Sequence, residues 1–173
     1  MKRSRTITWE DPMAAAREGL TLPGLEYLRS FVDGRLPRPP IASTMEMEAV
    51  EFEEGRAVFA CEPAEYHYNP IGVVHGGLAA TLLDSAMSCS IHTTLAAGER
   101  YTTLELKVNF VRAITAGTGR IRAEGTVVHR GGTIATAEGR LIAERDGKLL
   151  AHGVTTCLIM PGSEPARESH RKH

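Results

Sequence analysis

The segment from His75 to Gly98, HGGLAATLLDSAMSCSIHTTLAAG, constrains the fold more than any other part of the chain. It is small or apolar at most positions, and Asp84 is its only formally charged residue before Glu99. Such a run is typical of a helix buried on every side. Residues 78–97 also contain serines, threonines and His92, which favours a buried helix over a membrane span. A helix of this kind must be covered all round, so we expect a curled sheet and a partner chain.

The flanking segments have the pattern of strands. Before the helix, residues 41–61 predict a hairpin that turns at Glu53-Glu54-Gly55. After it, four strands are predicted, at residues 101–112, 120–130, 133–145 and 148–160. The predicted fold class is therefore α+β, with about six antiparallel strands wrapped around one central helix of residues 75–97, which Gly98 would end. In the first of the four strands the alternation predicts one face with Leu104, Leu106, Val108 and Phe110, and the other with Thr103, Glu105, Lys107 and Asn109.

The chain divides into three parts by composition. Residues 1–40 predict a helical extension, with helices at Asp11–Gly19 and 22–32 and a stiff proline-rich connector at 36–40. Residues 41–160 predict the sheet-and-helix domain. Residues 161–173 are almost without apolar side chains, so we expect a disordered tail.

Bulk properties exclude several classes of function. The formal net charge of −1 argues against a general nucleic-acid or anionic-membrane binder. No apolar run follows the N-terminus, so a cytoplasmic protein is expected. Its three cysteines form no Cys-x-x-Cys pair, which predicts buried reduced thiols and no zinc ribbon. His67, His75 and His92 lack the spacing of metal ligands, so neither a metal nor another cofactor is expected.

The start of the central helix is a candidate site. The first amides of a helix have no intrahelical acceptor, and Gly76 and Gly77 leave the approach to them open. Such an end can bind an anion or polarise a carbonyl, although two glycines can also serve only a tight entry into the helix. Asp84 lies 8 residues further on, or about 12 Å along a helix axis. One carbonyl can therefore touch both groups only if they come from two subunits.

Each candidate also has a structural interpretation. Asp84 could be a buried acid held by a nearby hydroxyl or backbone group. His75 could cap the helix, and we favour an orienting role for it over base chemistry. Asn69 could form a turn with Pro70, or its amide could hold water or a substrate carbonyl.

The segments Asn69-Pro70-Ile71-Gly72-Val73-Val74-His75-Gly76-Gly77 and Leu82-Leu83-Asp84-Ser85-Ala86 resemble the signature of hotdog-fold acyl-CoA thioesterases of the phenylacetate-degradation type. The resemblance extends over some 120 residues, to about Met160. It implies a homodimer as the minimal active unit, with a homotetramer as the larger assembly, acting on an acyl-CoA. The residues that it implicates in catalysis are Asp84, Gly76, Asn69, His75 and Thr103.

The implied roles follow the family pattern. Asp84 would act as general base on water or as nucleophile, and the Gly76 amide of the other subunit would polarise the thioester carbonyl. Gly77 would contribute to substrate binding. The chain departs from relatives at the turn Arg130-Gly131-Gly132-Thr133, where relatives often carry a cation after the glycine. In this chain Arg130 or Arg112 would then contact the CoA phosphates. Gly131 and Gly132 of the turn would belong to the same substrate-binding site.

Two alternatives stay open at this level. A non-catalytic acyl-CoA-binding protein could keep the fold and Gly76 but would not need Asp84. A hotdog dehydratase or hydratase would need a different pairing of histidine and acid. An α/β-hydrolase is excluded because the chain has no Gly-x-Ser-x-Gly and is too short.

Overall fold

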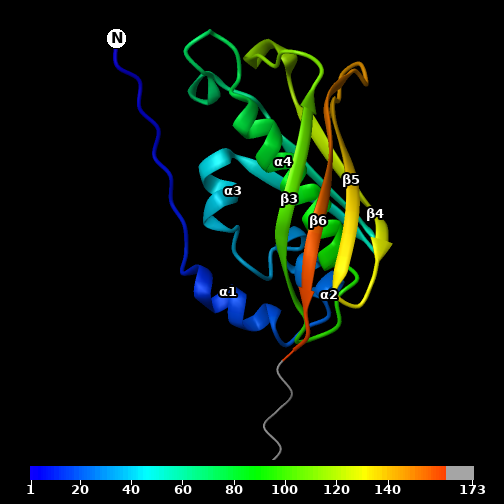
Figure 1. The fold of residues 1–173 in the computed structure, drawn as a ribbon. Coiled ribbons are helices and arrows are strands. Elements are labelled where there is room, and N and C mark those ends of the chain that lie inside the picture. The colour runs from blue at the N-terminus through cyan, green and yellow to red at the C-terminus, as the bar shows by residue number, and fades with distance from the viewer. Residues whose placement is uncertain (163–173) are drawn as a thin grey trace, which may run out of the picture.

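The computed structural model describes residues 1–162, and these form a layer of helices against one six-stranded antiparallel sheet (Figure 1). The sheet order is β1-β2-β4-β5-β6-β3. The strands are β1 Met47–Glu53, β2 Arg56–Cys61, β3 Arg100–Phe110, β4 Ile121–Arg130, β5 Ile134–Ala143 and β6 Leu149–Met160. The predicted hotdog architecture is therefore confirmed. Residues 163–173, which are most of the predicted tail, lie outside the described residues.

The N-terminal helices are α1 (Pro12–Gly19), α2 (Gly24–Val32) and α3 (Pro40–Met45). The first two agree with the sequence analysis, and Asp11 caps α1 as expected. The prediction of a strand from Ile41 is wrong, because residues 40–45 form α3. Pro40 opens that helix, where a proline loses no hydrogen bond. Glu46 adopts a left-handed φ of 52° and ends it, so β1 begins only at Met47.

The central helix α4 spans Gly76–His92 and is shorter than predicted. Beyond His92 the backbone tightens: the Thr94 amide donates to the Ile91 carbonyl and the Leu95 amide to the His92 carbonyl. The Thr93 and Thr94 hydroxyls bond back to carbonyls of the last turn. Gly98 does not cap the helix, since its φ of 85° belongs to the later turn into β3. Within the described part of the chain no helix is long and apolar enough to cross a membrane.

A row of three glycines sets how closely α4 approaches the sheet. Gly125 of β4 pairs with Gly139 of β5, which pairs with Gly153 of β6. A Cβ on Gly125 would lie 2.3 Å from the Ala86 carbonyl oxygen of α4. A Cβ on Gly139 would lie 2.7 Å from the Met87 side chain. The absence of three neighbouring side chains therefore creates a trough that receives the α4 backbone at Ala86 and the side chain of Met87.

A β-bulge in β3 corrects the predicted faces of that strand. Thr103 pairs with Cys157 and Glu105 with Thr156, so Leu104 is the extra residue. A bulge reverses the alternation beyond it. Opposite residues of an antiparallel pair share a face, and Thr103, Leu106, Val108 and Phe110 are opposite the buried residues Cys157, Thr155, Gly153 and Ala151. Thr103 is therefore on the helix side together with the later apolar residues, and not opposite to them as expected.

The N-terminal extension is integrated with the central helix. The Gly24 amide, which opens α2, donates to the Leu95 carbonyl just beyond α4 at 2.9 Å. A Cβ on Gly24 would lie 1.8 Å from the His92 carbonyl oxygen. The Tyr27 ring of α2 also packs at a tilt against His92, with ring centroids 5.5 Å apart. The start of α2 is thus in direct backbone contact with the end of α4.

Substitution of Gly125 by alanine tests the trough. The new methyl would meet backbone atoms of α4, which cannot rotate away as a side chain can. We expect Gly125→Ala to lower the free energy of unfolding by about 3 kcal/mol, measured by urea denaturation. Gly132→Ala is the matched control, because a Cβ there would meet nothing within 4 Å. Equal stability of the two variants would contradict the close approach of helix and sheet.

Candidate active site

Asp84 lies near the middle of α4, half-buried, and faces the bulged part of β3. The Thr103 hydroxyl donates a hydrogen bond to its Oδ1 at 3.1 Å. Burial raises the pKa of Asp84 above its ordinary value, and the bond from Thr103 offsets part of that rise. The bulge at Leu104 is what aims Thr103 at the acid. The structure therefore brings together two of the predicted site residues, and the higher pKa makes Asp84 a stronger base.

His75 is the N-cap of α4. Its Nδ1 accepts a hydrogen bond from the Gly77 amide at 2.8 Å. A Cβ on Gly77 would lie 2.8 Å from the same Nδ1, so the glycine lets the imidazole close over the helix end. The Gly77 amide is therefore occupied. The Nδ1 atom is an acceptor here, which assigns the ring proton of the neutral imidazole to Nε2.

The Gly76 amide is the uncommitted donor of the helix start. Among the hydrogen bonds formed by residues 1–162, none uses this amide as donor. It borders a surface hollow of about 410 Å³ whose lining includes Val73, Phe110 and Arg112. A Cβ on Gly76 would lie 3.0 Å from the Phe110 ring. Glycine at this position therefore allows the aromatic ring to pack close, while the N–H has no acceptor among the described residues.

Asn69 forms the turn that leads into this helix. Its Oδ1 accepts hydrogen bonds from the amides of Ile71 at 3.1 Å and Val73 at 3.3 Å. Its own backbone amide donates to the Val73 carbonyl at 2.8 Å. The side-chain oxygen is thus used to shape the loop, as the structural interpretation of Asn69 expects. The amide nitrogen of the side chain is the group that could still contact a ligand.

The two candidate arginines have different surroundings. Arg130 pairs with Glu99 at 3.0 Å and also donates to the Gly131 carbonyl, so its charge is compensated inside the chain. The Gly131 amide closes its turn by donating to the Ile134 carbonyl at 2.9 Å. Arg112 instead lines the hollow beside Gly76, and it donates to the Leu149 carbonyl at 2.5 Å. Only Arg112 is placed next to the helix start.

Sequence reasoning missed Phe110 as a neighbour of Gly76. The simple alternation had assigned it to the face away from Thr103, and the bulge that reverses the alternation has no strong sequence signal. Seven of the candidate residues form two groups, one beside the middle of α4 and one beside its start. The first comprises Asp84 and Thr103, and the second comprises Asn69, His75, Gly76, Gly77 and Arg112.

Comparison with known proteins identifies the family to which the chain belongs. Residues 71–150 match the model of the thioesterase superfamily. The chain is 28% identical over 119 residues to the 1,4-dihydroxy-2-naphthoyl-CoA hydrolase of Listeria monocytogenes. The matched region covers 69% of this chain and 93% of that protein.

Solved structures are also similar to this chain in sequence and in fold. A phenylacetic acid degradation-related protein of Ralstonia eutropha is 30% identical with a TM-score of 0.66, covering 76% of this chain and 98% of that one. A thioesterase family protein of Silicibacter pomeroyi is 25% identical with a TM-score of 0.68, covering 78% and 99%. By sequence and by fold, this chain belongs to the thioesterase superfamily and has its hotdog architecture.

Proposed function

We propose that the protein hydrolyses an acyl- or aryl-CoA thioester to a free carboxylic acid and CoA. The observation that carries this proposal is the half-buried carboxylate of Asp84, with a raised pKa and a hydroxyl partner, on the same helix as the free amide of Gly76. A CoA thioester hydrolase among the relatives supports the substrate class. The three free thiols fit a reducing compartment, and we propose the cytoplasm.

Thioester hydrolysis needs little beyond the carboxylate of Asp84 and the amide of Gly76. A thioester carbonyl is electrophilic and a thiolate leaves readily, so a carboxylate is sufficient as base or nucleophile. With Asp84 as base, the oxygen of water attacks the carbonyl carbon and the carboxylate takes the proton. The Gly76 amide stabilises the oxyanion, which then collapses as the carbon–sulfur bond breaks. The CoA thiolate leaves and is protonated, and the acid remains. Arg112, beside that amide, is the better candidate for the CoA phosphates.

The two halves of the site must come from two chains. Gly76 and Asp84 are separated by about 12 Å of helix, too far for one carbonyl to touch both. The edge strand β3 offers a surface for pairing, since Leu104 and Phe110 are 58% and 61% exposed in the single chain. Exposed apolar residues on an unpaired edge are typical of an interface. We therefore propose a homodimer as the minimal active unit, which can pair again into a tetramer.

The alternatives account for less of the geometry. A protein that only bound acyl-CoA would gain nothing from a carboxylate whose pKa is raised by burial. A dehydratase would pair the acid with a histidine, whereas in the described part of the chain the only side chain that hydrogen-bonds Asp84 is Thr103. Both observations favour hydrolysis.

Substitution of Asp84 tests the function directly. We expect Asp84→Asn and Asp84→Ala to lower kcat by about 10²–10⁴-fold, measured by thiol release from acetyl-, octanoyl- and benzoyl-CoA. A variant as active as the parent would show that the carboxylate takes no part. A parent protein inactive on the whole series would overturn the proposed reaction.

The thermal stability of Asp84→Asn provides the control, because the raised pKa of Asp84 fixes the direction in which the Tm should change. The folded-state pKa of Asp84 lies above the ordinary 3.8, so the ionised side chain destabilises the fold once the pH exceeds that ordinary value. Asparagine removes the charge and keeps an acceptor for Thr103. We expect Asp84→Asn to have a higher Tm than the parent at pH 7, with the difference closing below about pH 4. Inactive protein with a raised Tm cannot be explained by misfolding.

Thr103 is expected to position the acid and to tune it. Its hydrogen bond lowers the pKa of Asp84, so Thr103→Val should raise that pKa further. The rate depends on the ionised acid, so the acid limb of the kcat/KM profile should move to higher pH in this variant. Thr103→Ser, which keeps the hydroxyl, should leave the limb where it is in the parent. A Thr103→Val profile that coincides with that of the parent would contradict the coupling.

A single turnover in ¹⁸O-labelled water separates the two roles of Asp84. Attack by water places the label in the product acid. Attack by the carboxylate forms a mixed anhydride, and water that opens this anhydride at the Asp84 carbonyl carbon leaves the label in the Asp84 side chain, where peptide mass spectrometry detects it.

A further inference from the structure

An apolar cavity of about 300 Å³ lies between α4 and the N-terminal part of the chain. Its wall on α4 consists of Ser85 and Cys89, which are one turn apart. The remaining walls come from α2, the α3 region, β1 and β2. Their lining residues are Leu28, Phe31, Val32, Arg38, Pro39, Ile41, Ala42, Met47, Glu48, Ala49, Phe52 and Phe59. Only Arg38 and Glu48 bring charge to this lining.

The cavity is lined by the residue that follows the proposed catalytic acid in α4. Ser85 follows Asp84 directly in α4, and Cys89 is one turn further along. Three buried thiols are expected from the sequence, but Cys89 is half-buried, since it lines this space. Loss of water raises the pKa of Cys89 to about 12, and the charge of Asp84 adds to the rise. The thiol is therefore neutral and forms an apolar wall close to the carboxylate.

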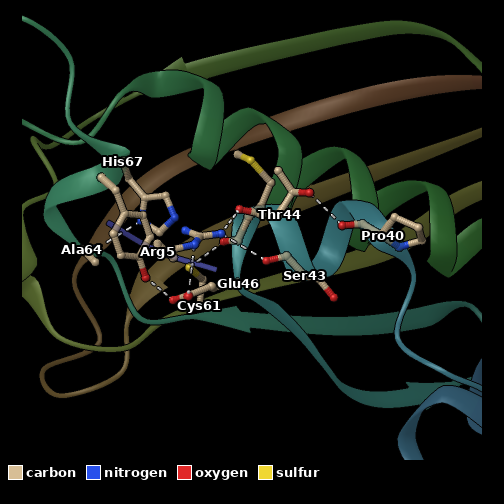
Figure 2. A network of polar contacts seen from close by, with 10 residues as sticks. Arg5, Pro40, Ser43, Thr44, Glu46, Cys61, Ala64 and His67 are labelled. Carbon is tan, nitrogen blue, oxygen red and sulfur yellow. Dashed lines mark hydrogen bonds and ion pairs between the residues drawn. The ribbon is translucent and has the colours of Figure 1, made fainter. Parts of the chain in front are cut away.

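The walls of the cavity are fixed before any ligand arrives. Figure 2 shows Arg5 reaching from the N-terminal segment to the end of α3, where it donates to the Thr44 carbonyl at 2.5 Å. Arg5 also forms an ion pair with Glu46 at 3.7 Å, and its guanidinium lies 4.2 Å from the Tyr66 ring centroid. On the other side, the backbone contact of Gly24 with the end of α4 fixes α2. A preformed cavity lowers the entropic cost of binding.

From this juxtaposition we propose that the cavity holds the apolar acyl group of the thioester, so that α2 and α3 set the acyl preference. The proposal rests on the hydrolase function proposed above. The link to Asp84 is the α4 wall: Ser85 is the next residue of the helix, and the charge of Asp84 acts on Cys89. The volume is at the lower end of the range for small-molecule sites, about 300–1,000 Å³. Together with the mostly apolar lining, this volume suits an uncharged medium-length alkyl or single-ring aryl group.

Two substitutions with opposite expected effects test the assignment. Ala49→Phe adds a ring to the β1 wall, and Ala49→Ser is its matched control. Phe31→Ala enlarges the space at the α2 wall, with Phe31→Leu as control. Across acetyl-, butanoyl-, octanoyl- and dodecanoyl-CoA we expect Ala49→Phe to lower kcat/KM for octanoyl-CoA about tenfold and to leave acetyl-CoA unchanged. Phe31→Ala should shift the preference toward dodecanoyl-CoA. A misfolded protein would lose activity on every chain length, so the two opposite shifts distinguish a changed pocket from a damaged fold.

A binding measurement separates this proposal from the proposed reaction. Calorimetry of octanoyl-CoA with Asp84→Asn, and with Asp84→Asn carrying Ala49→Phe, needs no turnover. We expect the added ring to weaken octanoyl-CoA binding about tenfold and to leave binding of acetyl-CoA unchanged. Equal weakening for both ligands, or none for either, overturns the acyl pocket even if the parent hydrolyses thioesters. Selective weakening with an inactive parent keeps the pocket and overturns the hydrolase.

Discussion

The contact between the backbone of α4 and the glycine row of the sheet determines the rest of the structure. Gly125, Gly139 and Gly153 are opposite one another on three neighbouring strands, and a Cβ on the first would overlap the Ala86 carbonyl. This contact fixes the depth of the helix and its rotation. Asp84 then faces Thr103 on β3, and Gly76 lies under Phe110 of the same strand. The close packing of α4 on the glycine row thus positions the residues of the candidate site.

The same helix holds an acid and a free amide that cannot meet on one substrate within the chain. Burial raises the pKa of Asp84, so the fold tolerates an unfavourable charge where a hydrolase would use it. At the helix start, His75 satisfies the Gly77 amide and leaves the Gly76 amide open. Symmetric pairing of two chains would place each group where the other is missing. The exposed apolar residues of the β3 edge give such a pairing a surface.

Much of this organisation could be predicted from the sequence. The small and apolar run after His75, charged only at Asp84, predicts the helix. The alternation of residues and the turns at Gly131-Gly132 and Asp146-Gly147 predict most of the strands. The bulge at Leu104 could not be predicted, since an extra residue in a strand leaves the composition unchanged and alters only the register. The helix at Pro40–Met45 was missed because its loose alternation resembled a strand. The glycine row depends on pairing between distant segments, and the cavity between α2, α3 and α4 depends on tertiary packing.

The central claim is that the site is shared between two chains, and hybrid dimers test it directly. Gly76→Pro removes the amide hydrogen at the first helical position, and His75 before it has the extended ψ of 135° that proline requires. Gly76→Ala is its matched control, because it brings the same Cβ to 3.0 Å from the Phe110 ring but keeps the N–H. Hybrids of Asp84→Asn and Gly76→Pro chains can be purified through two different tags and assayed by thiol release. If the site is shared, each hybrid dimer contains one intact site and should have about half the parent activity, while each variant alone is inactive. Hybrids as inactive as the single variants would place both groups in one chain and contradict the account.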